Sequence, residues 1–214
     1  MELANINTLK KILSSEGFNL KKALGQNFLI DPSVCPAMAE NACDKETGVL
    51  EIGPGAGVLT RSLCDKAKKV VAIELDTKLK PVLAKTLADK DNVEVIFGDA
   101  MKLDLKKIIE EKFSHCHRVA VCANLPYYIT SPIIMYLLES RLPIDNITVM
   151  VQKEAAERLC AKVGSREAGA VTVAVDYYSK GEILFLVDRE SFLPPPNVDS
   201  AVITLKIRKE PPVE

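Results

Sequence analysis

Glycines and acidic residues fall at the ends of three successive predicted strands, where they could bind a nucleoside. The segment EIGPGAG places Gly53, Gly55 and Gly57 between an apolar strand and a helix, and glycines there let the backbone turn tightly and approach a ligand. Glu74 ends the next strand and Asp99 the third. These carboxylates could accept ribose hydroxyls and face an adenine edge, respectively. Each residue alone also fits a tight turn or a surface acid, but the ordered set predicts a nucleoside site.

The glycine spacing leaves the identity of the nucleoside open. GxGxG differs from the GxGxxG pattern of dinucleotide-binding folds. NAD and S-adenosylmethionine (AdoMet) share a ribose and an adenine, however, so both fit these three strand ends.

A fourth predicted strand ends in NLPY, residues 124–127, which suits methyl transfer to the exocyclic amine of adenine. That nitrogen is a poor nucleophile because its lone pair is delocalised into the ring. The Asn124 side-chain oxygen and the Leu125 carbonyl could accept its hydrogens and direct the lone pair at a methyl donor, while Pro126 fixes the turn. Tyr127 could stack on an unpaired or flipped base. Catalysis would then depend on orientation and preorganised hydrogen bonds rather than on a general base; the alternative is a loop asparagine beside core tyrosines.

Strands alternate with helices along most of the chain, which predicts a parallel sheet covered on both faces. Two helices are predicted first. One spans residues 3–14, and the other has Asp31 as its cap and ends at about Cys43. The predicted strands are 49–53, 69–75, 93–99, 118–125 and 147–152. The predicted helices are 56–67, 76–88, 105–113, 131–140 and 153–162, with Ser131 as cap and Pro132 at the first position of the fourth.

The last part of the chain breaks this alternation. Three strands are predicted over residues 170–179, 182–192 and 200–209, with no room for a helix between the last two. The sheet is therefore expected to end in an antiparallel hairpin, within one domain that spans residues 1–214.

Composition indicates an ordinary globular protein of 214 residues, 48% hydrophobic and 27% charged. A net charge of −1 means that any nucleic-acid contact must be local. The six cysteines form no CxxC pair and are expected to be reduced in a cytoplasmic protein. His115 and His117 lack two further ligands at zinc-like spacing, so no metal site is predicted. No apolar run reaches transmembrane length, and Lys10 and Lys11 interrupt any signal-peptide core.

Seven segments stand in the order seen in one family. They are GQNFL, EIGPGAGVLT, VVAIELD, GDAM, NLPYYITSPI, VQKEAAERL and FLPPPNVDSAVI. In these, the chain resembles the KsgA family of small-subunit rRNA adenine N6-dimethyltransferases, from about residue 20 to 207. The resemblance implies a Rossmann-like class I AdoMet-dependent methyltransferase fold with a mostly parallel seven-stranded sheet. It also implies dimethylation of two adjacent adenosines in a hairpin loop near the 3′ end of small-subunit rRNA, in the immature 30S subunit, by a monomer.

The resemblance also assigns roles to residues. It implies AdoMet contacts from Gln26, Asn27, Leu29, Gly53, Gly55, Glu74, Leu75, Asp99, Ala100 and Asn124. It implies catalysis by Asn124, Leu125, Pro126 and Tyr127, and base binding by Tyr127, Tyr128, Phe192 and Pro194. Residues 1–46 would close the cofactor site.

Family members continue into a helical C-terminal domain that grips RNA, and this chain stops at Glu214. A core domain without that RNA-docking part is therefore expected. Local basic residues are either phosphate contacts or solvated faces: Lys10, Lys11, Lys21, Lys22, Lys153, Arg158, Lys162 and Arg166.

Three other functions are weighed against this one. The macrolide-resistance methyltransferases of large-subunit rRNA are close relatives, but they usually read Asn-Ile-Pro-Tyr where this chain has Leu125. A ribosome-assembly factor that docks without methylating is less consistent with an intact NLPY. An NAD-dependent dehydrogenase is disfavoured by the GxGxG spacing and by NLPY, which hydride transfer does not need.

Overall fold

The computed structural model describes residues 6–16 and 28–210. The α-helices are α1 (Ile6–Ser15), α3 (Val34–Ala42), α4 (Val58–Lys66), α5 (Lys80–Thr86), α6 (Leu105–Lys112), α7 (Tyr127–Glu139), α8 (Lys153–Leu159) and α9 (Ala170–Tyr178). The strands are β1 (Phe28–Leu29), β2 (Thr47–Ile52), β3 (Lys69–Glu74), β4 (Val93–Phe97), β5 (Arg118–Asn124), β6 (Asn146–Gln152), β7 (Ser179–Val187), β8 (Phe192–Leu193) and β9 (Ser200–Ile207). Two 3-10 turns, Thr77–Leu79 and Arg189–Ser191, complete the described elements.

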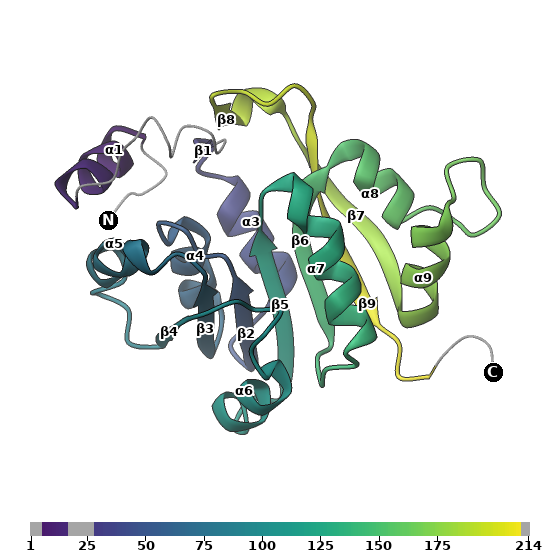
Figure 1. The fold of residues 1–214 in the computed structure, drawn as a ribbon, viewed down its shortest axis with the longest axis horizontal. Helices are drawn as coiled ribbons and strands as arrows, with labels where there is room; N and C mark the ends of the chain where they lie inside the picture. The colour runs from purple at the N-terminus through teal and green to yellow at the C-terminus, as the bar shows by residue number, and fades with distance from the viewer. Residues whose placement is uncertain (1–5, 17–27, 211–214) are drawn as a thin grey trace.

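Seven strands form the central sheet in the order β4-β3-β2-β5-β6-β9-β7 (Figure 1). The pairs β3–β4, β2–β3, β2–β5 and β5–β6 are parallel. Strand β9 lies between β6 and β7 and is antiparallel to both. The predicted mostly parallel sheet with an antiparallel end is therefore confirmed. A separate two-stranded sheet pairs β1 with β8.

Two apolar layers cover the faces of the sheet. The first packs α6, α7, α8 and α9 against side chains such as Leu50, Val121 and Ile203. The second packs α3 and α4 against Val49, Cys122 and other side chains of the opposite face. Neighbouring residues of β2 and β5 thus point to opposite faces, as the two-residue period of a strand requires.

The prediction of a strand over residues 170–179 was wrong, because most of this segment is helix α9. Alternating valines suggested a strand, yet Gly169 donates its N–H to Thr172 Oγ1 at 3.0 Å and starts a helix. Thr172 Oγ1 donates in turn to the Arg158 carbonyl at 2.6 Å, which ties α9 to the end of α8. Contacts distant in sequence therefore override the local preference for a strand.

Two helix starts also differ from the prediction. Helix α7 begins at Tyr127 rather than after Ser131, and Pro132 lies inside it. The Pro126 carbonyl accepts from the Thr130 hydroxyl at 3.0 Å, which supports the earlier start. Helix α3 begins at Val34 with Ser33 at its N-cap, and Asp31, two residues before Ser33, accepts the Ser33 N–H at 2.9 Å.

The strand predicted over residues 182–192 is two strands. Strand β7 ends at Val187, and a 3-10 turn separates it from β8. Because β8 pairs with β1 instead of β9, the chain leaves the large sheet at this point. Within the described residues, no helix is long and apolar enough to cross a membrane.

Candidate active site

The sheet order brings the four predicted strand ends together. Strands β4, β3, β2 and β5 are neighbours and parallel, so their carboxyl ends meet at one edge. The chain leaves β2 toward β3 on one side, whereas β5 lies on the other side. Ligands in open α/β sheets bind where the strand order reverses in this way, outside the carboxyl ends. The crevice between β2 and β5 is therefore the candidate active site.

The glycine turn after β2 has a backbone that other residues rarely adopt. Gly53, Gly55 and Gly57 have φ values of 71°, 56° and 86°, all in the left-handed region that favours glycine. A side chain at Gly53 would lie 2.8 Å from the Leu125 side chain, whereas a side chain at Gly55 would meet no atom of the described residues within 4 Å beyond its two chain neighbours. The turn thus touches the loop after β5 at one end and leaves its backbone accessible at the other.

Glu74, at the end of β3, holds this turn in place. Its Oε2 accepts the Gly55 N–H at 3.0 Å, and its Oε1 accepts the Asp76 N–H at 2.8 Å. The residue is 7% exposed, so the carboxylate is fixed close to the glycine backbone. Leu75, the next residue, is 67% exposed and could cover an apolar ligand surface.

Asp99 follows β4 at the same edge. Its Oδ1 accepts the Met101 N–H at 3.0 Å, and its Oδ2 lies 3.6 Å from Lys102 Nζ. The Gly98 N–H donates to the Glu74 carbonyl at 2.9 Å, which holds the two strand ends together. Ala100 is buried beside Asp99.

Asn124 ends β5 with its amide free. Within the described part of the chain, its side chain makes no hydrogen bond, although the residue is partly buried. Leu125 packs against Gly53, and the Pro126 carbonyl is occupied by Ile129 and Thr130. A polar amide is thus held beside the glycine turn with its donors and acceptor available.

The two tyrosines that follow have different environments. The Tyr127 hydroxyl hydrogen-bonds to Ser200 Oγ at 2.7 Å, which ties the start of α7 to the start of β9. Tyr128 is 84% exposed, so its ring is accessible on the surface of the loop.

Phe192 is not presented to the crevice, because it is 3% exposed and packs in the second apolar layer. Leu29, its partner in the β1–β8 pair, is buried in the same layer. Pro194 is exposed just beyond β8. Stacking of a base on Phe192 would therefore require this segment to move. Gln26 and Asn27 lie outside the described residues.

Glu51 is a buried acid at this site that the motif analysis did not select. It lies in β2 two residues before Gly53 and is 1% exposed. Its Oε2 and the Thr60 hydroxyl are buried, and neither makes a hydrogen bond with the described residues. Burial raises the pKa of Glu51 to about 8; the Thr60 hydroxyl lowers it in part, and the Glu74 carboxylate raises it further. A charged residue inside the apolar segment VLEIG was the available signal.

Basic residues also lie near this edge. Lys153 starts α8 directly after β6 and is exposed, as are Lys162 and Arg166 in the connection to α9. Arg158 is paired with Glu154, which lowers the charge that it can offer to phosphates.

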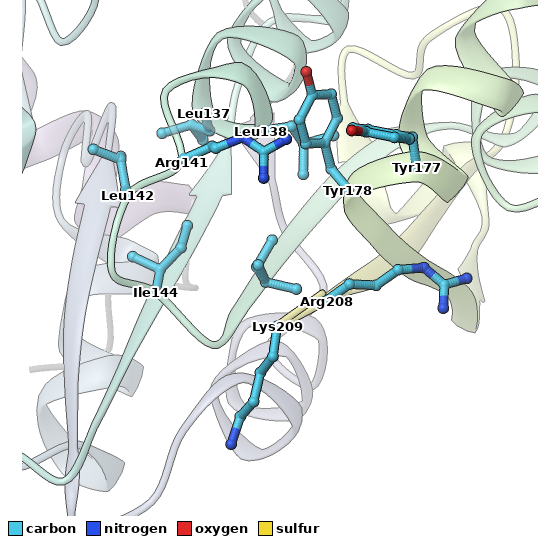
Figure 2. Close-up of a pocket in the computed structure, with 10 residues that line it drawn as sticks. Leu137, Leu138, Arg141, Leu142, Ile144, Tyr177, Tyr178, Arg208 and Lys209 are labelled. Atoms are coloured by element: carbon cyan, nitrogen blue, oxygen red, sulfur yellow. The ribbon is translucent and has the colours of Figure 1, made fainter. Parts of the chain in front are cut away.

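A second hollow lies at the opposite edge of the sheet (Figure 2). This cavity of about 200 Å³ is lined by residues at the end of α7 and just after it, at the end of α9, and at the end of β9 and just after it. The Arg141 guanidinium lies 5.8 Å and 5.2 Å from the ring centres of Tyr177 and Tyr178. None of the predicted site residues lines this cavity, and α7 separates it from NLPY by about 20 Å, at 1.5 Å per residue.

Solved structures define the class of the fold. The crystal structure of the 23S rRNA methyltransferase ErmE aligns with a TM-score of 0.72 and 32% identity, over 88% of this chain and 72% of that one. A dimethyladenosine transferase from Plasmodium falciparum aligns with a TM-score of 0.69 and 35% identity, over 84% and 62%. The chain therefore has the class I methyltransferase fold.

Sequence comparison defines the family. A family model described as ribosomal RNA adenine dimethylase matches residues 17–214. The chain belongs to this family. Ribosomal RNA small subunit methyltransferase A of Bacillus licheniformis is 50% identical over 205 residues, which are 95% of this chain and 70% of the relative. The protein of the same name from Geobacillus thermodenitrificans is 50% identical over 213 residues, 99% of this chain and 73% of the relative.

Proposed function

We propose that this chain methylates the exocyclic N6 of two adjacent adenosines in a hairpin loop near the 3′ end of small-subunit rRNA, with AdoMet as methyl donor. The free amide of Asn124, held beside the glycine turn, is the observation that carries this proposal. Relatives that are 50% identical and named for the small ribosomal subunit support the choice of RNA. The substrate would be the immature 30S subunit in the cytoplasm, and the enzyme would act as a monomer.

The described residues fit AdoMet. Apart from Gly55 and its two chain neighbours, no atom of the described residues lies within 4 Å of the position that a Gly55 side chain would take, so the cofactor could approach the backbone closely there. Glu74 offers a carboxylate to the ribose and Asp99 one to the adenine, as adjacent strand ends do in related folds. The unpartnered Glu51 oxygen suits a positively charged ligand better than the pyrophosphate of NAD. AdoMet would supply an electrophilic methyl group on a sulfonium centre.

The residues after β5 would prepare the amine for attack. The Asn124 side-chain oxygen and the Leu125 carbonyl would accept the two N6 hydrogens, so that the nitrogen lone pair faces the methyl group. Tyr127, restrained by Ser200, would support the base, and exposed Tyr128 would contact it from the loop. Such preorganised groups act mainly in the transition state.

A methylation assay on both ribosomal subunits tests the proposal. Radiolabelled AdoMet is incubated with the chain and immature small subunits, large subunits or neither, and the RNA is digested to nucleosides. We expect N6,N6-dimethyladenosine from the small subunit alone. Label in the large subunit alone would instead support the activity for which ErmE is named. AdoMet binding without transfer to either RNA would favour a docking factor.

A further inference from the structure

Glu51 is the buried ionisable group that the proposed mechanism leaves without a role. Its Oε2 has no hydrogen-bond partner in the part of the chain that the structure describes, and an unpaired buried carboxylate costs far more free energy than a neutral carboxyl group. No cationic side chain in the described ranges pairs with it. It also lies directly beneath the glycine turn, two residues before Gly53 and facing Thr60 in the first turn of α4.

Among the described residues, the groups around Glu51 provide no positive charge. Glu74 on β3 adds a second carboxylate, and Thr60 on α4 is neutral. The thiols of Cys35 on α3, Cys64 on α4 and Cys122 on β5 face it. Burial raises the pKa of each of these thiols to about 12 or well above its usual value, so all three stay neutral. Since like charges disfavour ionisation, the Glu74 carboxylate adds to the burial that keeps Glu51 protonated in the empty protein.

We propose that Glu51 is protonated in the ligand-free protein and ionises when AdoMet binds, so that cofactor binding releases a proton. This inference rests on the proposed function, because it requires AdoMet at the glycine turn. The ligand carries a sulfonium and an ammonium against one carboxylate, and its net charge of +1 would relieve the repulsion between Glu51 and Glu74. The Glu51 carboxyl O–H bond breaks, its electron pair stays on the carboxylate, and the proton passes to the solvent buffer.

The linkage has a defined direction. In the empty protein the pKa of Glu51 is about 8, so the group is mostly protonated at pH 7. If the bound ligand lowers this pKa below 6, the dissociation constant for AdoMet falls about tenfold per pH unit between pH 6 and 7.5. The α-amino group of the ligand titrates itself near pH 8, so measurements stay below that value.

Calorimetry on the whole chain tests the proposal. AdoMet is titrated at pH 7 in phosphate, imidazole and Tris, whose ionisation enthalpies differ. The slope of the observed binding enthalpy against the ionisation enthalpy of the buffer then gives the number of protons released. We expect nearly one proton for the wild type and nearly none for Glu51→Gln. Glu94→Gln is the matched control, because Glu94 is a strand glutamate paired with Lys69 and Lys112, and it should release protons like the wild type. S-adenosylhomocysteine, which lacks the sulfonium charge, should release fewer.

Each outcome separates the two proposals. If AdoMet does not bind the wild type, the proposed function fails. If AdoMet binds with no proton release, or Glu51→Gln releases as many protons as the wild type, only the present inference is overturned. Infrared difference spectra of the wild type supply a variant-free measurement in case Glu51→Gln does not fold. AdoMet should remove a protonated-carboxyl stretch, and its persistence would refute the ionisation of Glu51.

Discussion

The proposed cofactor side and the proposed base side of the crevice are held in different ways. On the cofactor side, meaning the glycine turn with Glu74 and Asp99, each carboxylate already accepts backbone N–H groups from its own neighbourhood. On the base side, meaning residues 124–128 and Phe192, Asn124 is free, Tyr128 is exposed and Phe192 is buried.

This difference matches the two proposed ligands. A small cofactor can bind to a preformed surface, because protein groups that are already fixed lose little conformational entropy on binding. A base that is flipped out of a large RNA needs an open loop first. The base side is therefore expected to be completed only when RNA binds, through movement of the β8 segment that contains Phe192.

Glu51→Gln should change the pH dependence of stability most. The folded pKa of Glu51, about 8, lies above its ordinary value of 4.5. The wild type therefore has the full stability of the protonated form below pH 4.5 and loses it as pH rises to 8. At about 1.4 kcal/mol per pKa unit, the ceiling on this loss is roughly 5 kcal/mol. Urea denaturation at pH 5 and pH 8.5 should show that the free energy of unfolding falls less in Glu51→Gln than in the wild type. An equal fall in both proteins would contradict the assignment of Glu51 as a buried acid.

Asn124→Ala should lower methyl transfer by about 100-fold or more, as expected when one preorganised polar group is removed from an active site. AdoMet affinity should stay nearly unchanged, because the lost contact acts in the transition state. Asn124→Asp is the sharper variant, since it keeps the size but places a negative charge beside RNA phosphates. Single-turnover transfer to immature small subunits is the measurement, and wild-type rates in both variants would make Asn124 a structural residue.

Glu74→Ala should weaken AdoMet binding by about 1–3 kcal/mol, because ribose hydroxyls and two backbone N–H groups lose their acceptor. Glu94→Ala serves as control, since it removes a strand glutamate that pairs with surface lysines instead. The measurement is the dissociation constant for AdoMet, determined by calorimetry for the wild type and both variants. An unchanged constant in a folded Glu74→Ala protein would exclude the ribose role.

Tyr127→Ala should reduce RNA methylation more than AdoMet binding, because stacking on one base contributes about 1–3 kcal/mol. Steady-state rates at varied RNA concentration, beside calorimetry with AdoMet, separate the two effects. If AdoMet affinity falls as much as methylation, Tyr127 belongs to the cofactor side and not to the base side.

Ser200→Ala should have the smallest effect, about 1 kcal/mol of stability, through loss of one hydrogen bond to Tyr127. The thermal midpoint should fall by a few degrees, and AdoMet affinity should stay unchanged. Tyr127→Phe removes the same hydrogen bond by deleting the other hydroxyl, and it should lower the stability by the same amount as Ser200→Ala. Unequal losses would show that one of the two hydroxyls has a further partner.

Local signals predicted the backbone around the glycine turn well. Glycines at positions 53, 55 and 57 predicted a tight turn, and all three have the positive φ that such a turn uses. The alternation of strands and helices predicted the parallel sheet, since each apolar strand is short and bounded by turn residues. The roles assigned to these residues remain predictions, because they concern ligands.

Other features depended on contacts that no local pattern encodes. Residues 170–178 read as a strand, yet the carbonyl of Arg158 and the packing of α8 select a helix. The early start of α7 likewise depends on its anchorage by Pro126 and Ser200. Phe192 is buried because β8 pairs with β1, a partner more than 160 residues earlier in the chain.

The local sequence shows which strands end in chemically useful groups, because a glycine turn and a terminal carboxylate are local features. Which of these groups lie together depends on the folded chain. The order β4-β3-β2-β5 brings Asp99, Glu74, the glycine turn and Asn124 to one edge, and strand order depends on long-range pairing. The same packing enclosed Glu51 without a counter-charge. Its raised pKa arises from desolvation in the folded core, which is why the sequence alone did not reveal it.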